Sequence, residues 1–355
     1  MGSAAAAHLA SRGQRVLGLE QFQPAHDRGS SHGNSRVIRL AYFEHPAYVP
    51  LLRRAYQLWR RLEIDTGRRL LQITGGLMIG APDSEVVAGS LRSAQEHDLA
   101  HEMLDADAIR RRFPPFTPRK ETVAFYESEA GCLFPEEAIR AHLDVAVDDG
   151  AHLHFDERVL DWRIAASGSV EVTTTRSRYE ASRLVLSPGP WASELFKLDW
   201  LKLVVEPQML YWFEPSGGAG PFTPRHFPIY IWDLGDGVQF YGFPADEDGR
   251  VKVAFFRTRN GAEPALRAAL APCIPKLATG ALLATADCRY TSTPDHHFVL
   301  GLHPAHQQVV IASPCSGHGY KFAAVVGEIL ADLAIDGTTR HPIDLFAPAR
   351  FAGSA

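Results

Sequence analysis

The chain has 355 residues, 46% hydrophobic and 22% charged, which is the composition of an ordinary folded protein of one large or two medium domains. A formal net charge of -5 gives no electrostatic argument for binding nucleic acid or an anionic membrane. The sequence has no apolar run near the roughly 20 residues that a membrane span needs, and its start does not have the pattern of a signal peptide.

Four scattered cysteines are present, and their spacing matches neither a CxxC motif nor a Cys/His zinc site. In a chain of this size they fit a reducing cytoplasm better than a disulfide scaffold, so we expect a cytoplasmic protein without a bound metal. The cysteines are Cys132, Cys273, Cys288 and Cys315.

The first part of the chain alternates between expected helices and strands. Residues 1–13 are rich in alanine and end in glycine, which favours a short helix. Residues 14–20 form an apolar run that ends in an acid, which predicts a buried strand. A loop rich in Gly, Ser and His follows. Helices are then expected over 48–62, 84–96 and 107–113, a short apolar run lies at 37–42, and a strand is expected over 74–80.

The middle of the chain is rich in expected strands, and the alternation returns at its end. A helix is predicted over 135–150, because acids occupy its first turn and glycine follows its end. Further strands are expected over 152–155, 159–163, 170–175, 183–187, 309–312 and most of 212–256, with a last helix over 320–335.

This order predicts an α/β nucleotide-binding domain interrupted by an antiparallel substrate domain. We assign residues 1–70, 135–201 and 289–355 to the first domain. Residues 71–134 and 202–288 are assigned to the second.

A dinucleotide-binding unit needs a first strand, a GxGxxG turn, a helix, a second strand and an acid at the end of that strand. Here Gly2 matches the last glycine of that turn, and Glu20 lies 18 residues later, near the spacing that suits a ribose hydroxyl. The first strand and the first two glycines are missing. The alternative is that 4–9 is an ordinary helix and Glu20 a solvated end of a strand.

Several separated strings occur along nearly the whole chain in a fixed order. They are GLEQFQPAHDRGSSHGNSRVIRLAY (18–42), TGGLMIG (74–80), LVLSPGPW (184–191), YGFP (241–244), CRYTSTPDHHFVL (288–300) and SGHGYKF (316–322). Together they resemble the monomeric sarcosine oxidase family, which includes N-methyltryptophan oxidase and pipecolate oxidase. The resemblance implies a Rossmann-like FAD-binding domain, here without its N-terminal strand, joined to an antiparallel-sheet substrate domain.

The resemblance also implies an activity. It predicts a monomeric oxidase that converts a small secondary amino acid into an imine with FAD, uses O2 to reoxidise the flavin, and releases hydrogen peroxide before the imine is hydrolysed. Two alternatives stay open. One is an FAD dehydrogenase that passes electrons to a carrier, and the other is a truncated, inactive protein without flavin.

The cysteine of the CRYTSTPD string matches the one that bonds covalently to the flavin. Without that context, Cys288 would be read as an inert core residue. Other positions match parts of the family that contact the cofactor. These implied cofactor-binding residues are Gly2, Glu20, Ser30, Ser31, His32, Ser35, Val159, Cys288, Gly317 and Gly319.

Arg39 and Lys321 match the pair that holds the substrate carboxylate, a role that suits a planar guanidinium and an ammonium. The alternative is that Arg39 only forms a structural ion pair and that Lys321 only begins a helix. The resemblance further places Tyr241 and Tyr290 in the wall of the substrate pocket and His318 next to the substrate.

Two more cations match catalytic positions. Arg36 is implied to lie near the flavin ring, where positive charge stabilises the reduced form, and Lys252 is implied to help activate O2. The alternative is that Lys252 only protects the edge of a strand.

Two further departures from the family concern the substrate domain. The stretch between Lys252 and Cys288 is shorter than usual, so we expect its helical part to be trimmed. Phe256 stands where sarcosine oxidase has a pocket histidine, which predicts a larger or more apolar substrate than sarcosine.

Overall fold

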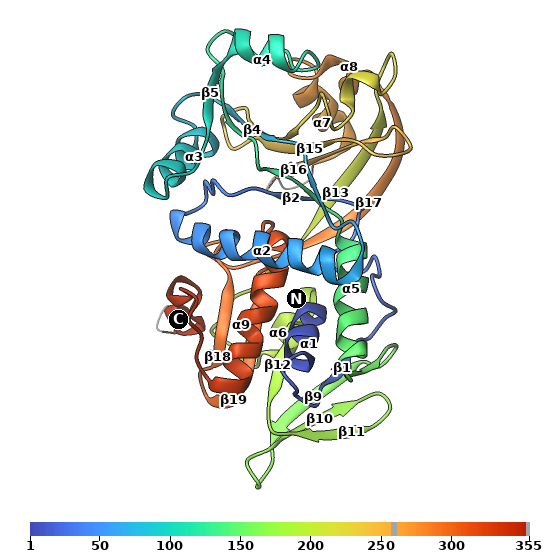
Figure 1. Cartoon of the computed structure of the whole chain (residues 1–355), viewed down its shortest axis with the longest axis vertical. Helices are drawn as coiled ribbons and strands as arrows, with labels where there is room; N and C mark the ends of the chain where they lie inside the picture. The colour runs from blue at the N-terminus through green and yellow to red at the C-terminus, as the bar shows by residue number, and fades with distance from the viewer. Residues whose placement is uncertain (257–260, 353–355) are drawn as a thin grey trace.

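The computed structural model describes residues 1–256 and 261–352. Figure 1 shows a molecule with two lobes. One lobe contains both ends of the described chain and the long C-terminal helix, and the other contains a large, curved sheet. The predicted α/β class is confirmed.

The lobe with the chain ends contains parallel strands next to helices. Strand β1 (Leu17–Leu19) pairs in parallel with β8 (His152–His154), and β12 (Leu184–Leu186) pairs in parallel with β19 (His306–Ser313). Strand β18 (Val299–His303) continues the second group as the antiparallel neighbour of β19. Within the described residues these two groups are separate sheets, and no strand precedes the first helix.

Helices cover these strands. Helix α1 (Gly2–Ala10) packs against both α5 (Pro135–Asp148) and α9 (Ala323–Asp336). Its alanines are buried, and their small side chains allow the three helices to approach closely (Figure 1). A separate antiparallel sheet joins β9 (Val159–Ile164), β10 (Val170–Thr174) and β11 (Arg178–Ala181) at the far end of the lobe.

The other lobe is built on a sheet of eight strands in the described part of the chain, in the order β17-β13-β16-β15-β14-β4-β6-β5. All neighbours run antiparallel except β4 and β14, which run parallel. The strands are β4 (Gly76–Gly80), β5 (Glu102–Asp105), β6 (Val123–Glu127), β13 (Val204–Glu214), β14 (Ile229–Asp233), β15 (Gln239–Ala245), β16 (Val251–Phe256) and β17 (Ala281–Ser292). They come only from 76–127 and 204–292, although the domain boundaries themselves stay a prediction.

The remaining elements connect or cover these sheets. Helix α2 (Val49–Thr66) lies between the lobes in Figure 1, beside the small sheet of β2 (Arg36–Ile38), β7 (Gly131–Leu133) and β3 (Leu71–Ile73). The other helices are α3 (Glu85–Glu96), α4 (Ala106–Arg112), α6 (Ala192–Leu195), α7 (Glu263–Leu270) and α8 (Pro275–Ala278), and the 3-10 turns are 46–48, 189–191, 220–222, 320–322, 344–346 and 348–351.

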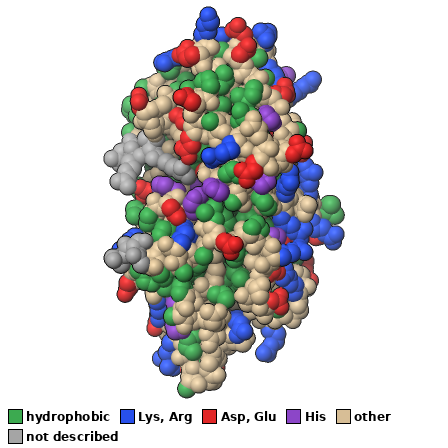
Figure 2. Space-filling model, turned by 90° about the vertical axis from the view of Figure 1, so that its left-hand side faces the viewer, with side chains coloured by type: hydrophobic (Ala, Val, Ile, Leu, Met, Phe, Trp, Pro, Cys, Tyr) green, Lys and Arg blue, Asp and Glu red, His purple; other side chains and the backbone are tan. Residues whose placement is uncertain are grey.

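The surface has no single dominant sign of charge on the face that Figure 2 shows. Lys and Arg side chains alternate there with Asp and Glu, and histidines gather near the middle of the face. None of the helices in the described ranges combines the length and apolarity needed to cross a membrane.

Candidate active site

A cavity of about 1370 Å³ runs through the lobe that contains the chain ends and reaches the large sheet. One end lies among α1, the end of β1 and the start of β9, where Gly2, Glu20 and Val159 form its wall. The other end lies against β15, β16 and β17. A single cavity therefore joins most of the site residues predicted from the sequence.

The residues expected at the site fall into two groups. Those that line the cavity are Gly2, Glu20, Ser30, Ser31, Arg36, Arg39, Val159, Tyr241, Phe256, Cys288, Tyr290, Gly317, His318, Gly319 and Lys321. The cavity wall does not include His32, Ser35 or Lys252, as far as the described residues define it.

The three residues outside the cavity wall lie directly behind it. The buried ammonium of Lys252 donates to the carbonyls of Gly33 at 2.8 Å and Ser35 at 2.5 Å. Burial, and then the charge of Arg36, lower the pKa of Lys252 well below its usual value. His32 is also buried and faces a smaller pocket on the other side of the same loop.

The turn after β19 brings backbone close to the cavity. Gly317 adopts φ +88°, and a Cβ there would lie 2.7 Å from the ring of Tyr290. At Gly319 a Cβ would lie 1.6 Å from the carbonyl oxygen of Pro314. Only glycine fits at these two positions, so the backbone of Gly317 and Gly319 forms part of the cavity wall.

Cys288 is buried in β17 and meets a cation. A terminal N–H of Arg36 donates to its sulfur at 3.4 Å, and the same guanidinium donates to the carbonyls of Ser30 and Ser35. Burial raises the pKa of the Cys288 thiol, but Arg36 and then His32 outweigh burial and hold this pKa below its usual value. The arrangement favours the nucleophilic thiolate.

Arg39 is almost completely buried directly after β2. Its guanidinium lies between the rings of Tyr42 and Phe43, at 4.2 and 4.1 Å from their centres. One nitrogen donates to the carbonyl of Ala41, and the other forms a 2.5 Å ion pair with Glu44. An incoming carboxylate would therefore compete with Glu44 for Arg39.

Lys321 supplies a second buried cation. Its ammonium donates to the carbonyl of His318 at 2.6 Å and to the hydroxyl of Tyr42 at 3.4 Å. Burial, and then repulsion from Arg39, lower the pKa of Lys321 to about 7, although Glu44 opposes this shift. Two cations and a single nearby carboxylate make a site that favours an added anion.

Aromatic and histidine side chains complete this end of the cavity. The ring of His318 bonds to the Tyr42 hydroxyl at 2.5 Å and to the carbonyl of His296 at 2.9 Å. Because that carbonyl needs a donor, Nε2 carries the proton and Nδ1 accepts from Tyr42. Burial raises the pKa values of Tyr241 and Tyr290, so both keep their hydroxyl protons.

Several residues that contact the predicted site residues in or beside the cavity are absent from the set that the sequence predicts, and three of them are Tyr42, Glu44 and Ile231. Glu44 and Ile231 line the cavity, and Tyr42 touches both His318 and Lys321. Tyr42 and Glu44 follow Arg39 within five residues, and this closeness to a predicted site residue could have indicated that they belong to the site. Nothing in the local sequence distinguishes Ile231 from a core residue.

The chain is similar to known proteins along nearly its whole length. The family profile described as "FAD dependent oxidoreductase" matches residues 1–333. The chain is 50% identical to monomeric sarcosine oxidase of Streptomyces avermitilis over all of this chain and 96% of that protein. It is 32% identical to N-methyl-L-tryptophan oxidase of Salmonella dublin over 99% of this chain and 96% of that protein.

Solved structures share the fold. NikD, an amino acid oxidase essential for nikkomycin biosynthesis, matches with a TM-score of 0.82 and 25% identity, over 98% of this chain and 94% of its own. L-proline dehydrogenase from P. horikoshii matches with a TM-score of 0.85 and 21% identity, over 99% and 94% of the two chains. The similarity to L-proline dehydrogenase shows the fold alone.

Proposed function

Because the chain belongs to the family of FAD-dependent oxidoreductases, we propose that it oxidises the C–N bond of a small N-substituted amino acid and transfers the electrons to O2. The pairing of two buried cations, Arg39 and Lys321, beside the aromatic end of the cavity supports this proposal most directly. The names of the curated relatives support the same substrate class.

The cavity has the features that FAD requires. It is long enough to join Glu20 and Val159 to Cys288 and Tyr290, and the Gly317–Gly319 turn exposes backbone along it. Glu20 would hold the ribose, and Ser30 and Ser31 would contact the cofactor from the loop after β1. We further propose a covalent bond from Cys288 to the flavin, which its lowered pKa and its contact with Arg36 support.

FAD, when bound, supplies the redox chemistry by accepting two electrons from the C–N bond and transferring them to O2, which yields hydrogen peroxide. The protein's part is orientation and electrostatics. Arg39 and Lys321 bind the substrate carboxylate and thereby fix the amine end within the cavity. His318, Tyr241 and Tyr290 form the wall around it.

The substrate loses two hydrogens and becomes an imine, and water then cleaves the imine to an aldehyde or ketone and an amine. Arg36, whose guanidinium lines the cavity, would stabilise negative charge on the reduced ring. For Lys252 the expected role in O2 activation stays a prediction, because its ammonium hydrogen-bonds Gly33 and Ser35 behind the cavity wall.

We also propose that the protein acts in the cytoplasm as a monomer. Its four cysteines are free thiols, which fits a reducing compartment, and several of its curated relatives are named monomeric. The structure describes no group of three or more His, Cys, Asp or Glu side chains that could hold a metal ion.

A peroxide assay on purified protein tests the proposal. We expect an oxidised-flavin spectrum, colour that stays with acid-precipitated protein, and one peroxide per amine oxidised under air. Flavin without peroxide, but with reduction of an artificial electron acceptor, would favour the dehydrogenase alternative. If the protein purified from cells grown with riboflavin contains no flavin, the alternative of a truncated, inactive protein would be favoured. Cys288→Ser should release the colour on precipitation.

The same assay addresses the size of the substrate. Phe256 and Ile231 give the cavity an apolar wall near Tyr241. We expect a higher kcat/KM for N-methyltryptophan or pipecolate than for sarcosine, and a clear preference for sarcosine would contradict the role proposed for Phe256.

A further inference from the structure

Glu127, the last residue of β6, is a carboxylate buried in the large-sheet lobe with only 2% of its surface exposed. Both of its oxygens accept hydrogen bonds from consecutive backbone groups of the segment that follows β2. Oε1 accepts from the N–H of Leu40 at 2.6 Å, and Oε2 accepts from the N–H of Ala41 at 2.9 Å. A buried carboxylate with two N–H partners is held tightly in place, and so are the groups it binds.

The segment that Glu127 holds is the one that carries Arg39. Residue Ala41 donates its N–H to Glu127, and its carbonyl accepts from the guanidinium of Arg39 at 2.7 Å. Ala41 therefore joins the carboxylate of Glu127 on β6 to the guanidinium of Arg39. Burial raises the pKa of Glu127, while the two N–H groups and then the charge of Arg39 favour its ionised form.

Other contacts of the same segment come from α3. The hydroxyl of Ser93 donates to the carbonyl of Tyr42 at 2.6 Å. At Gly89 a Cβ would lie 2.6 Å from the carbonyl oxygen of Phe43, so the helix touches the segment directly. Since the rings of Tyr42 and Phe43 enclose the Arg39 guanidinium, a shift of this backbone would move the guanidinium as well.

We propose that Glu127 is the positioning residue of the substrate-carboxylate site, and that it acts by fixing the Leu40–Ala41 backbone against which Arg39 is oriented. The inference rests on the proposed function, because it takes Arg39 as the group that binds the carboxylate. The proposal adds a residue of β6 that does not line the cavity.

Replacement of Glu127 by glutamine is the sharpest test, because the side chain keeps its size. The amide oxygen can accept from one N–H, but the amide nitrogen would face the other N–H as a second donor. Glu129→Gln is the matched control, since Glu129 is an exposed carboxylate two residues later whose ion pair is with Arg60.

The probe is methoxyacetate, in which an ether oxygen replaces the amine nitrogen of sarcosine, and its Kd is measured by calorimetry on the flavin-containing protein. Glu127→Gln should raise this Kd about tenfold, as the loss of one buried hydrogen bond predicts. It should raise KM more than it lowers kcat, and it should leave flavin content unchanged. Glu129→Gln should match the wild type.

A double-mutant cycle separates positioning from general damage. In an Arg39→Ala background, Glu127→Gln should change the Kd less than about twofold, because the cation that Glu127 positions is gone. Fully additive effects, or an unchanged Kd in the single variant, would overturn the inference. If the glutamine variant does not fold, Glu127→Asp is measured in its place, since it keeps the charge but withdraws both oxygens.

The controls also separate this inference from the proposed function. Wild-type protein that binds methoxyacetate, and loses it in Arg39→Ala, supports the proposed function whatever Glu127 does. Wild-type protein that binds none, or that binds it equally well without Arg39, overturns both.

Discussion

Lys321 shows how two cations can share one buried site. Its ammonium lies among Arg39, Tyr42 and the carbonyl of His318, with little exposure to solvent. The charged form is costly there because of burial and because Arg39 repels it, which brings the pKa of Lys321 to about 7. A bound carboxylate would offset both effects, so binding of the anion and protonation of Lys321 should be coupled.

This coupling predicts a pH-dependent affinity. Below about pH 7 Lys321 carries its proton before the ligand arrives, and affinity for methoxyacetate should be highest. Above that pH the ligand must recruit a proton, and the Kd should rise by up to about tenfold per pH unit. Calorimetry from pH 6 to 9, in buffers of different ionisation enthalpy, measures the proton uptake directly.

Variants at Lys321 supply the control. Lys321→Met should raise the Kd at pH 6, spare flavin content and abolish the proton uptake. A wild-type Kd that stays constant across this range would show that Lys321 does not exchange a proton on binding.

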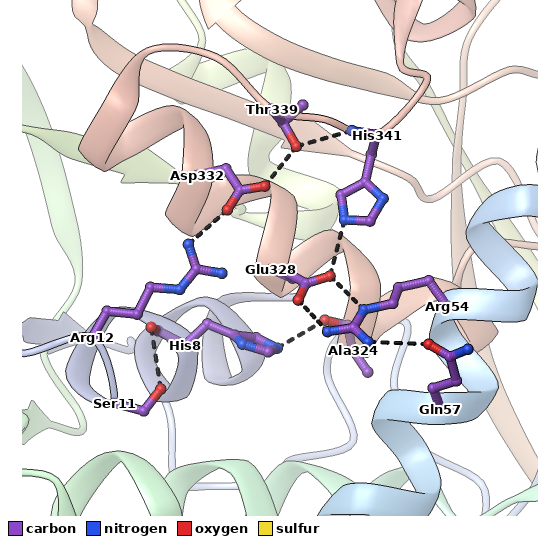
Figure 3. A network of polar contacts seen from close by, with 10 residues as sticks. All are labelled: His8, Ser11, Arg12, Arg54, Gln57, Ala324, Glu328, Asp332, Thr339 and His341. Carbon is purple, nitrogen blue, oxygen red and sulfur yellow. Dashed lines mark hydrogen bonds and ion pairs between the residues drawn. The ribbon is translucent and has the colours of Figure 1, made fainter.

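At the scale of the elements, α9 is tied to its neighbours by the polar network in Figure 3. The buried carboxylate of Glu328 accepts two hydrogen bonds from Arg54 of α2, at 2.9 and 2.6 Å, and contacts the ring of His341 at 2.9 Å. On the same helix, Asp332 pairs with Arg12, which follows α1. These contacts fix α9 against α2 and against the residues after α1, and α1 and α9 both contribute to the cavity wall.

Glu328→Gln should lower the free energy of unfolding by about 2 kcal/mol, because hydrogen bonds to a charged group are lost. Burial opposes the ionised form, but Arg54 and then His341 hold the pKa of Glu328 well below its usual 4.5. Since the folded pKa is depressed, the contribution is complete above that value and is lost as the pH falls towards the folded pKa.

Thermal unfolding of both proteins between pH 3 and pH 7 measures this difference, which should shrink as the pH decreases below about 4.5. Asp65→Asn, which removes an exposed ion pair with Arg61 on α2, should change stability by less than about 0.5 kcal/mol. A Glu328→Gln variant as stable as this control would contradict the prediction.

At the scale of the whole molecule, the cavity lies among segments that are far apart in the chain. Its wall takes residues from α1, both groups of parallel strands and the large sheet. A ligand that fills it would contact all of these at once and bind the folded state alone. Such a ligand stabilises the fold by an amount that depends on its concentration relative to its Kd.

We therefore expect FAD to raise the Tm of protein in which the covalent bond cannot form. Cys288→Ser protein stripped of flavin, then titrated with FAD, should gain about 2.7 kcal/mol when FAD reaches 100 times its Kd. Hydrogen exchange should slow in β1 and β12, which border the cavity. A Tm that FAD leaves unchanged would mean that this cavity is not where FAD binds.

The sequence alone predicted most elements of the lobe that contains the chain ends, because each carries a local signal. The helix predicted over 135–150 ends at Asp148, and the strand predicted over 309–312 lies within β19. By contrast, β17 had no clear pattern, since it contains three alanines and most of its first half is exposed. It becomes a strand by pairing along its length with β13.

The residues of the site divide in the same way. Motif strings are local, so residue type and order along the chain were enough to identify Arg39, Cys288 and Lys321. The lowered pKa of Lys321 depends on distances between separate parts of the chain, and so do the hydrogen bonds that Glu127 accepts from Leu40 and Ala41. Burial and charge act through space, so only the tertiary structure could decide them.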